Sequence, residues 1–179
     1  MKIKDMMLSA VFAAVMCIFA VITIPIGAVP ISMAMLGIVL TACVLGHRRA
    51  AAAIAVYILI GAVGFPVFSG FRGGLPVIIG PTGGYILAYI PTAMFIGYFT
   101  QKLPQGRVRA VAKLAAVSFC GVLISYAVGT AWFAAVTGTA LLQSLMICVA
   151  PFAVFDIVKC IVGAMLGSTL RRNLEKISR

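Results

Sequence analysis

The sequence predicts an all-α integral membrane protein with six transmembrane helices and with both termini in the cytoplasm. Of its 179 residues, 64% are hydrophobic and only 9% are charged, about a third of the roughly 25% that is usual in soluble domains. A hydrocarbon core about 30 Å thick needs roughly 20 helical residues. Six crossings and their connections therefore use the whole chain, and we expect residues 1–179 to form a single domain.

Six apolar stretches are the predicted spans. In chain order they cover residues 8–26, 31–46, 50–63, 85–99, 113–136 and 143–170. The first follows Lys2 and Lys4 as the apolar part of a signal peptide would, but it is longer than such a part and lacks an Ala-x-Ala site, so we expect a retained helix. The second and third are short, so they must extend into their turns or thin the bilayer.

Basic residues gather in alternate connections, which predicts the orientation. Arg72 lies between spans three and four, and Lys159 lies within span six. The other twelve of the 14 fall on one side of the predicted membrane: Lys2, Lys4, Arg48, Arg49, Lys102, Arg107, Arg109, Lys113, Arg171, Arg172, Lys176 and Arg179. Because positively charged connections stay in the cytoplasm, we expect a multi-pass protein of the cell membrane with residues 64–84 outside.

The composition disfavours several other classes of protein. A net charge of +11 is compatible with nucleic-acid binding only where the basic residues share one wetted face, and here apolar spans separate them. The sequence has no GxxxxGK[ST], HExxH or GxSxG motif, and its only acidic residues are Asp5, Asp156 and Glu175. We therefore expect no ATP site, no catalytic residues and no metal site. The cysteines all lie in apolar stretches without CxxC spacing, so a disulfide framework is not expected.

Residues 64–84 form the first candidate binding feature. They hold seven of the 18 glycines together with Pro66, Pro76 and Pro81, so a regular helix is not expected. The segment is also apolar, with three phenylalanines. Irregular backbone at membrane depth is tolerated where it is buried in protein or lines a cavity. We predict a lid or pocket wall on the outer face, against the alternative of an outer loop without a role.

Asp156 and Lys159 form the second feature. A charge at the centre of a transmembrane helix costs about 2.5–3.5 kcal/mol on insertion scales, so the pair needs a reason to be kept. Their i, i+3 spacing places both on one helix face, where they offset each other and share a polar ligand. A purely structural ion pair is the alternative.

Two pairs of small residues have the spacing of close helix contacts. Ala10 and Ala14 lie in the first span, and Gly163 and Gly167 lie in the sixth. By spacing alone, packing inside the protein is the expected use of either pair.

Four runs of the sequence resemble the BioY proteins, the substrate-binding S-components of energy-coupling-factor (ECF) biotin transporters. They are GGLPVIIGPTGGY (73–85), PTAMFIGY (91–98), YAVGTAW (126–132) and PFAVFDIVKCIVGAML (151–166). The likeness runs from the first span to the sixth. It is weakest around Arg72, where the type of polar residue differs among members of the family.

The resemblance implies a six-helix S-component-like bundle that captures biotin on the outer face and delivers it inward. Its partners would be a transmembrane T-component and two ABC ATPase subunits, and biotin would be a transported ligand rather than a cofactor. Ala10 and Ala14 match the family's surface for docking the T-component. Expected biotin-binding residues are Asp156, Lys159, Arg72, Tyr85, Gly83, Gly84 and Trp132.

One alternative function comes from a different class of protein. A small membrane enzyme or a proton-coupled carrier would use the Asp156 and Lys159 pair for proton transfer. A proton relay normally needs more than one titrating group within the membrane, and the spans hold no second acidic residue. This alternative is therefore disfavoured.

Overall fold

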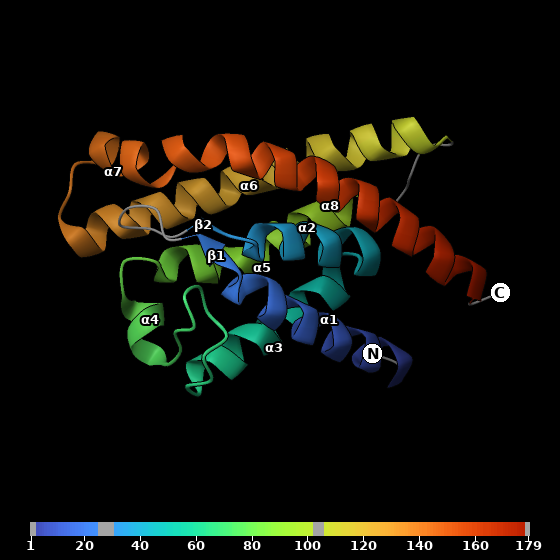
Figure 1. The fold of residues 1–179 in the computed structure, drawn as a ribbon, viewed down its shortest axis with the longest axis horizontal. Helices are drawn as coiled ribbons and strands as arrows, with labels where there is room; N and C mark the ends of the chain where they lie inside the picture. The colour runs from blue at the N-terminus through green and yellow to red at the C-terminus, as the bar shows by residue number, and fades with distance from the viewer. Residues whose placement is uncertain (1–2, 25–30, 102–105, 178–179) are drawn as a thin grey trace.

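The computed structural model describes residues 3–24, 31–101 and 106–177, and it is helical apart from one short hairpin. Figure 1 shows the arrangement. The elements in chain order are α1 (Ile3–Val21), β1 (Thr23–Ile24), β2 (Ile31–Ser32), α2 (Ala34–Leu45), α3 (His47–Ala62), α4 (Leu75–Ile79), α5 (Gly83–Phe99), α6 (Arg107–Thr137), α7 (Leu141–Cys148) and α8 (Ala150–Ile177).

Helix α2 is the centre of the bundle. It is hydrophobic on all sides, and every one of its residues except Leu36 and Val44 is buried. A helix of this kind needs neighbours all around it, and α2 packs against α1, α3, α5 and α8. In Figure 1, α6 and α8 run side by side along one long edge of the molecule, with α1 and α3 on the other.

Close contact between α2 and α8 depends on two glycines. A Cβ atom at Gly163 would collide with Val39, and one at Gly167 would collide with Cys43. The prediction that this pair serves packing inside the protein is therefore confirmed.

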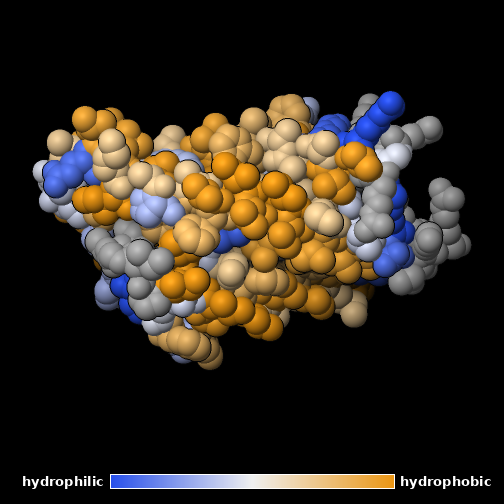
Figure 2. Space-filling view, turned by 45° about the horizontal axis from the view of Figure 1, so that its top comes forward, coloured by the Kyte–Doolittle hydropathy of each residue, from blue (hydrophilic) through white to orange (hydrophobic). Residues whose placement is uncertain are grey.

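Several helices have the length and apolar composition that crossing a membrane requires. Helices α1, α6 and α8 are each long and apolar enough to cross a bilayer, and α2 and α5 are shorter apolar helices. Figure 2 shows hydrophobic residues over the middle of one face and hydrophilic residues gathered towards its two ends.

The observed helices differ from the predicted spans in three places. The first helix begins and ends earlier than the predicted span 8–26. It ends at Val21 because the chain beyond it pairs as a hairpin, in which Thr23 faces Ser32 and Ile24 faces Ile31. The second helix accordingly starts at Ala34 rather than at residue 31. The sixth predicted span is two helices, since the chain turns at Val149 and α8 begins next to Pro151.

The segment 64–84 is mostly irregular, as predicted, but it also contains the five-residue helix α4. This helix starts at Leu75 with Pro76 in its first turn, where a proline needs no backbone N–H donor. The prediction of no regular helix missed it.

The connections sort into two ends of the molecule. The start of α1, the α2–α3 junction, the end of α5 and the end of α8 lie at one end in Figure 1, and α4, the hairpin and the α6–α7 turn lie at the other. Arg48, Arg49, Arg171 and Arg172 are therefore at one end and Arg72 is at the other. Some positions named in the predicted spans and basic connections fall outside the described residues, namely Lys2, Ile26, Lys102 and Arg179.

Candidate functional site

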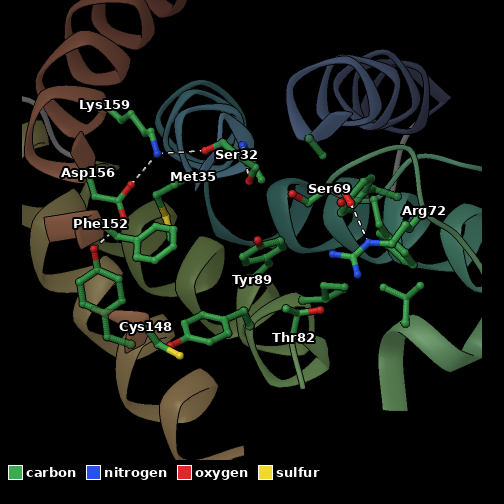
Figure 3. A pocket seen from close by; sticks show the side chains of 18 residues that line it. Ser32, Met35, Ser69, Arg72, Thr82, Tyr89, Cys148, Phe152, Asp156 and Lys159 are labelled. Atoms are coloured by element: carbon green, nitrogen blue, oxygen red, sulfur yellow. Dashed lines mark hydrogen bonds and ion pairs between the residues drawn. The ribbon is translucent and has the colours of Figure 1, made fainter. Parts of the chain in front are cut away.

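A narrow cavity lies among α2, α3, α5, α6, α8 and the segment before α4. Its open space admits the centres of water-sized molecules over about 80 Å³. Three charged residues line it, namely Arg72, Asp156 and Lys159. Figure 3 places Asp156 and Lys159 on one side of this cavity and Arg72 on the opposite side, with Tyr89 between them.

Both oxygens of the acidic group in the cavity accept from neighbours, and each has a further lone pair for another donor. Lys159 Nζ lies 2.8 Å from Asp156 Oδ1, and Tyr126 donates a 2.6 Å hydrogen bond to Asp156 Oδ2. The Asp156 and Lys159 side chains are only 6% and 8% exposed. A buried charge must be paired to be tolerated, and here each carboxylate oxygen has a donor.

Lys159 also fixes the hairpin to α8. Its ammonium donates a 2.9 Å hydrogen bond to the backbone carbonyl of Ser32 in β2. The pair therefore joins α8, α6 and the connection between α1 and α2 at one wall of the cavity. A ligand that bonds to Lys159 would contact a group whose position is already set.

Arg72 lies in a tight turn that is anchored by a buried aromatic side chain. The backbones of Phe68 and Arg72 exchange hydrogen bonds of 2.9 and 3.4 Å, and Arg72 Nε donates to the Ser69 carbonyl at 3.2 Å. Phe68 is fully buried and meets the Tyr57 ring edge-on, with 5.6 Å between ring centroids. Gly61 leaves room for that ring, because a Cβ atom there would collide with it.

Between the charged sides the walls are aromatic and apolar. They include Tyr57, Tyr85, Tyr89, Tyr126 and Phe152. The Tyr85 hydroxyl is held 2.8 Å from Thr130 Oγ1. Such walls suit a flat ligand whose rings are apolar on their faces and polar at their edges.

The structure brings four of the predicted binding residues together and places three elsewhere. Asp156, Lys159, Arg72 and Tyr85 line the cavity, whereas Gly83, Gly84 and Trp132 do not. Trp132 donates a 3.0 Å hydrogen bond from its indole to the Gly80 carbonyl, and Gly84 lets it pack against the start of α5. These three residues pack together at the α4–α5 turn, behind the residues that line the cavity.

Several lining residues escaped the sequence interpretation. Ser69 is the most informative, since its buried hydroxyl oxygen has no hydrogen-bond partner in the described part of the protein. Ser32, Met35, Tyr57, Tyr89, Tyr126 and Phe152 were also missed. Most of them sit in ordinary apolar helix sequence, where only tertiary packing decides which face meets the cavity.

Ala10 and Ala14 both lie on the exposed face of α1. Exposed apolar residues surround them along the helix, among them Met6, Met7, Val11 and Ile18. They do not pack inside this chain, so the expectation from spacing alone was wrong for this pair.

The fold and the cavity together define a helical membrane protein with an internal cavity lined by charged and aromatic side chains. A family model described as the BioY family matches residues 1–176, and the chain belongs to this family. A "Probable biotin transporter BioY" of Pyrococcus horikoshii is 37% identical over 97% of this chain and 99% of its own length. A "Biotin transporter BioY" of Rhizobium etli is 34% identical over 93% of this chain and 92% of its own.

The fold also matches a solved structure. A crystal structure described as the S-component for biotin from an ECF-type ABC transporter superposes with a TM-score of 0.86. The sequences are 28% identical, and the match covers 96% of this chain and 92% of the other. The chain is thus a multi-pass membrane protein of a transporter family rather than of an enzyme family.

Proposed function

We propose that this chain is the substrate-capture subunit of a biotin uptake system. It binds biotin from the outer side as a transported ligand and delivers it inward together with an ECF T-component and two ABC ATPase subunits. The observation that carries the proposal is the cavity with hydrogen-bonding groups at one side and a separate cation at the other.

Biotin likewise has hydrogen-bonding groups at one end and a charged group at the other. Its ureido group carries two N–H donors and one carbonyl acceptor, and its valerate chain ends in a carboxylate. The cavity's three charged residues sum to one positive charge, because Asp156 and Lys159 offset each other and Arg72 remains. A site with this net charge favours a monoanion of that kind.

The geometry favours one orientation of the ligand. Asp156 accepts and Lys159 donates, so this side of the cavity complements the ureido edge. Arg72 uses Nε for the Ser69 carbonyl, and its two terminal nitrogens suit a bidentate contact with the carboxylate. The unpartnered Ser69 hydroxyl lies beside Arg72 in the same turn and offers a further hydrogen bond.

We further propose that all six helices α1, α2, α3, α5, α6 and α8 cross the membrane as one domain with both termini in the cytoplasm. The sorting of connections between two ends of the molecule supports this topology, as does the excess of basic residues at the end that holds the termini. The exposed face around Ala10 and Ala14 is the surface that we assign to the T-component.

Titration calorimetry with the purified chain tests the assignment of the ligand. We expect biotin to bind with a dissociation constant at least a hundredfold lower than that of lipoate. Lipoate carries the same carboxylated chain on a sulfur ring but has no ureido group, so it forgoes the hydrogen bonds to Asp156 and Lys159. Equal affinity for the two compounds would contradict the proposal.

A further inference from the structure

A second, larger hollow lies at the opposite end of the molecule from the biotin site. It opens between the ends of α1 and α8, and its space admits the centres of water-sized molecules over about 640 Å³. Both helices pack on α2, which has only 12 residues, so they project past its end. The α2–α3 junction at Val44, Leu45 and Gly46 forms part of the lining.

The lining of this hollow is strongly basic. Lys4, Arg48, Arg49 and Arg171 come from three different helices. Two of these cations are held in place by the protein. Arg49 pairs with Asp5 at 3.1 Å, and Arg171 donates hydrogen bonds of 2.6 and 2.8 Å to the carbonyls of Thr100 and Gln101.

Lys4 and Arg48 are different, because neither forms a hydrogen bond or ion pair within the described part of the chain. Both are exposed. Asp5 offsets the charge of Arg49, but Lys4 and Arg48 bring two further positive charges to a hollow that also holds Arg171, which is electrostatically unfavourable. An anion bound among them would offset the repulsion.

Aliphatic side chains share the lining with the cations. Leu8 of α1, Val44 of α2 and Leu174 of α8 line the same space. Figure 2 shows hydrophilic residues gathered beyond the hydrophobic middle of the face, at either end, which is where the polar headgroups of a bilayer would meet the protein. Aliphatic side chains would not stabilise a small free anion, whereas a lipid presents an anionic headgroup together with an acyl chain that these side chains can contact.

We propose that this hollow is a binding site for the headgroup of an anionic phospholipid, with a phosphate as its central recognised group. Lys4 and Arg48 contact the phosphate, and Leu8, Val44 and Leu174 contact the start of an acyl chain. Basic hollows between helices on the cytoplasmic side are known to suit such headgroups. The proposal rests on the proposed topology, which places this end of the molecule in the cytoplasm, and not on the identity of the transported ligand.

The test uses the full chain in a neutral detergent and counts bound lipid by native mass spectrometry. The probes are a phosphatidylglycerol, a phosphatidylcholine with the same acyl chains, and glycerol phosphate as the headgroup without chains. We expect one phosphatidylglycerol to bind in preference to the other two. The double variant Lys4→Gln/Arg48→Gln should weaken its binding about tenfold or more, since each basic residue near a charged lipid surface contributes about 1 kcal/mol.

The matched control is Arg109→Gln/Arg172→Gln, which removes two exposed cations at the same end but outside the lining. It should change phosphatidylglycerol affinity less than about threefold. Biotin titration of both variants checks that each is folded, because the biotin site is at the other end. Three results would overturn the proposal: equal losses in the two double variants, equal binding of phosphatidylcholine, or glycerol phosphate binding as tightly as the lipid.

A co-purification experiment distinguishes a lipid in the hollow from a protein partner that binds there. If Lys4→Gln/Arg48→Gln loses the T-component and ATPases but keeps phosphatidylglycerol, the hollow serves an acidic protein segment and the lipid site is refuted.

Discussion

At the scale of residues, the cavity depends on a small set of charges with unequal surroundings. Asp156 and Lys159 are buried and meet their partners inside the protein, whereas Arg72 is exposed and its side chain forms one hydrogen bond within the described part of the chain. A buried pair is costly to break, because removing one member leaves the other charge unpaired. Substitution of Arg72 leaves no buried charge unpaired, so its effect on biotin affinity reports on contact with the ligand more directly.

The role of Arg72 can be isolated by combining a variant with an altered ligand. Biotin amide has no carboxylate charge, so it should bind the unaltered chain about tenfold or more weakly than biotin, the range for a charged hydrogen bond. Arg72→Gln should reduce biotin affinity by a similar factor and leave amide affinity nearly unchanged. Titration calorimetry of the four combinations measures the coupling, and equal losses for both ligands would show that Arg72 does not meet the carboxylate.

The sequence pointed to the charged residues of the cavity for a simple physical reason. Charges are rare in this chain, so Arg72, Asp156 and Lys159 stand out in apolar surroundings. Tyr126 and Ser69 do not stand out, because tyrosine and serine are common in membrane helices and loops. Their importance follows from a hydrogen bond to Asp156 and from an unpartnered buried hydroxyl, and both need the folded arrangement. Trp132 was expected to cover the biotin rings with its aromatic face, but it does not line the cavity.

At the scale of elements, the turn between Phe68 and Arg72 shows how an irregular segment is held firmly. It is anchored by burial of the Phe68 ring against Tyr57 and the space left by Gly61. Glycine and proline content predicted that residues 64–84 would be irregular. It did not predict α4 or the anchor, because the partner of Phe68 lies in α3.

We expect Gly61→Val to displace the turn that carries Arg72. The added side chain would occupy the position of the Phe68 ring, and overpacking of this kind costs typically about 1–3 kcal/mol. Biotin affinity should fall about tenfold, and amide affinity less, because Arg72 moves while Asp156 stays in place. A combined Gly61→Val/Phe68→Leu variant should recover part of the loss, since the shorter side chain makes room. Unchanged biotin affinity in well-folded Gly61→Val would contradict this account of the anchor.

Helix α1 carries the other prediction at this scale. Ala10→Trp and Ala14→Trp should impair co-purification with the T-component, because close approach of two helices needs small residues at the contact. Both positions are exposed, so biotin binding by the isolated subunit should stay largely intact. Cys17→Trp, on a more buried part of the same helix, serves as a contrast that should affect folding first. Normal recovery of the complex from both alanine variants would remove α1 as the docking surface.

At the scale of the whole molecule, apolar composition predicted most of the helical architecture, whereas the orientation inferred from the basic connections stays a prediction. The all-helical fold was predicted correctly, and five of the six predicted spans each overlap one helix, of 12 residues in α2 to 31 residues in α6. The hairpin between α1 and α2 was missed because two-residue strands in apolar sequence have no periodicity of their own. The break at Val149 was missed because apolar residues continue through it, and only Pro151 hinted at a helix start.

Orientation is tested by labelling intact cells with a membrane-impermeant thiol reagent. Ala140→Cys, at the α6–α7 turn, should be labelled, and Asn173→Cys, near the end of α8, should be protected until the cells are opened. Both positions are exposed in the structure. The unaltered chain with its five cysteines gives the background. The reverse pattern would overturn the proposed topology.

The most direct test of the account is the biotin affinity of Asp156→Asn and Lys159→Met, measured by titration calorimetry on monodisperse protein. Asp5→Asn is the matched control, because it removes the acid of the ion pair with Arg49 at the opposite end of the molecule. In the proposed binding mode each site variant deletes a charged hydrogen bond to biotin, so we predict a rise of about tenfold to more than a hundredfold in dissociation constant, with the control within about twofold. If both site variants are folded and bind biotin as tightly as the unaltered chain, the pair is structural and the ligand binds elsewhere.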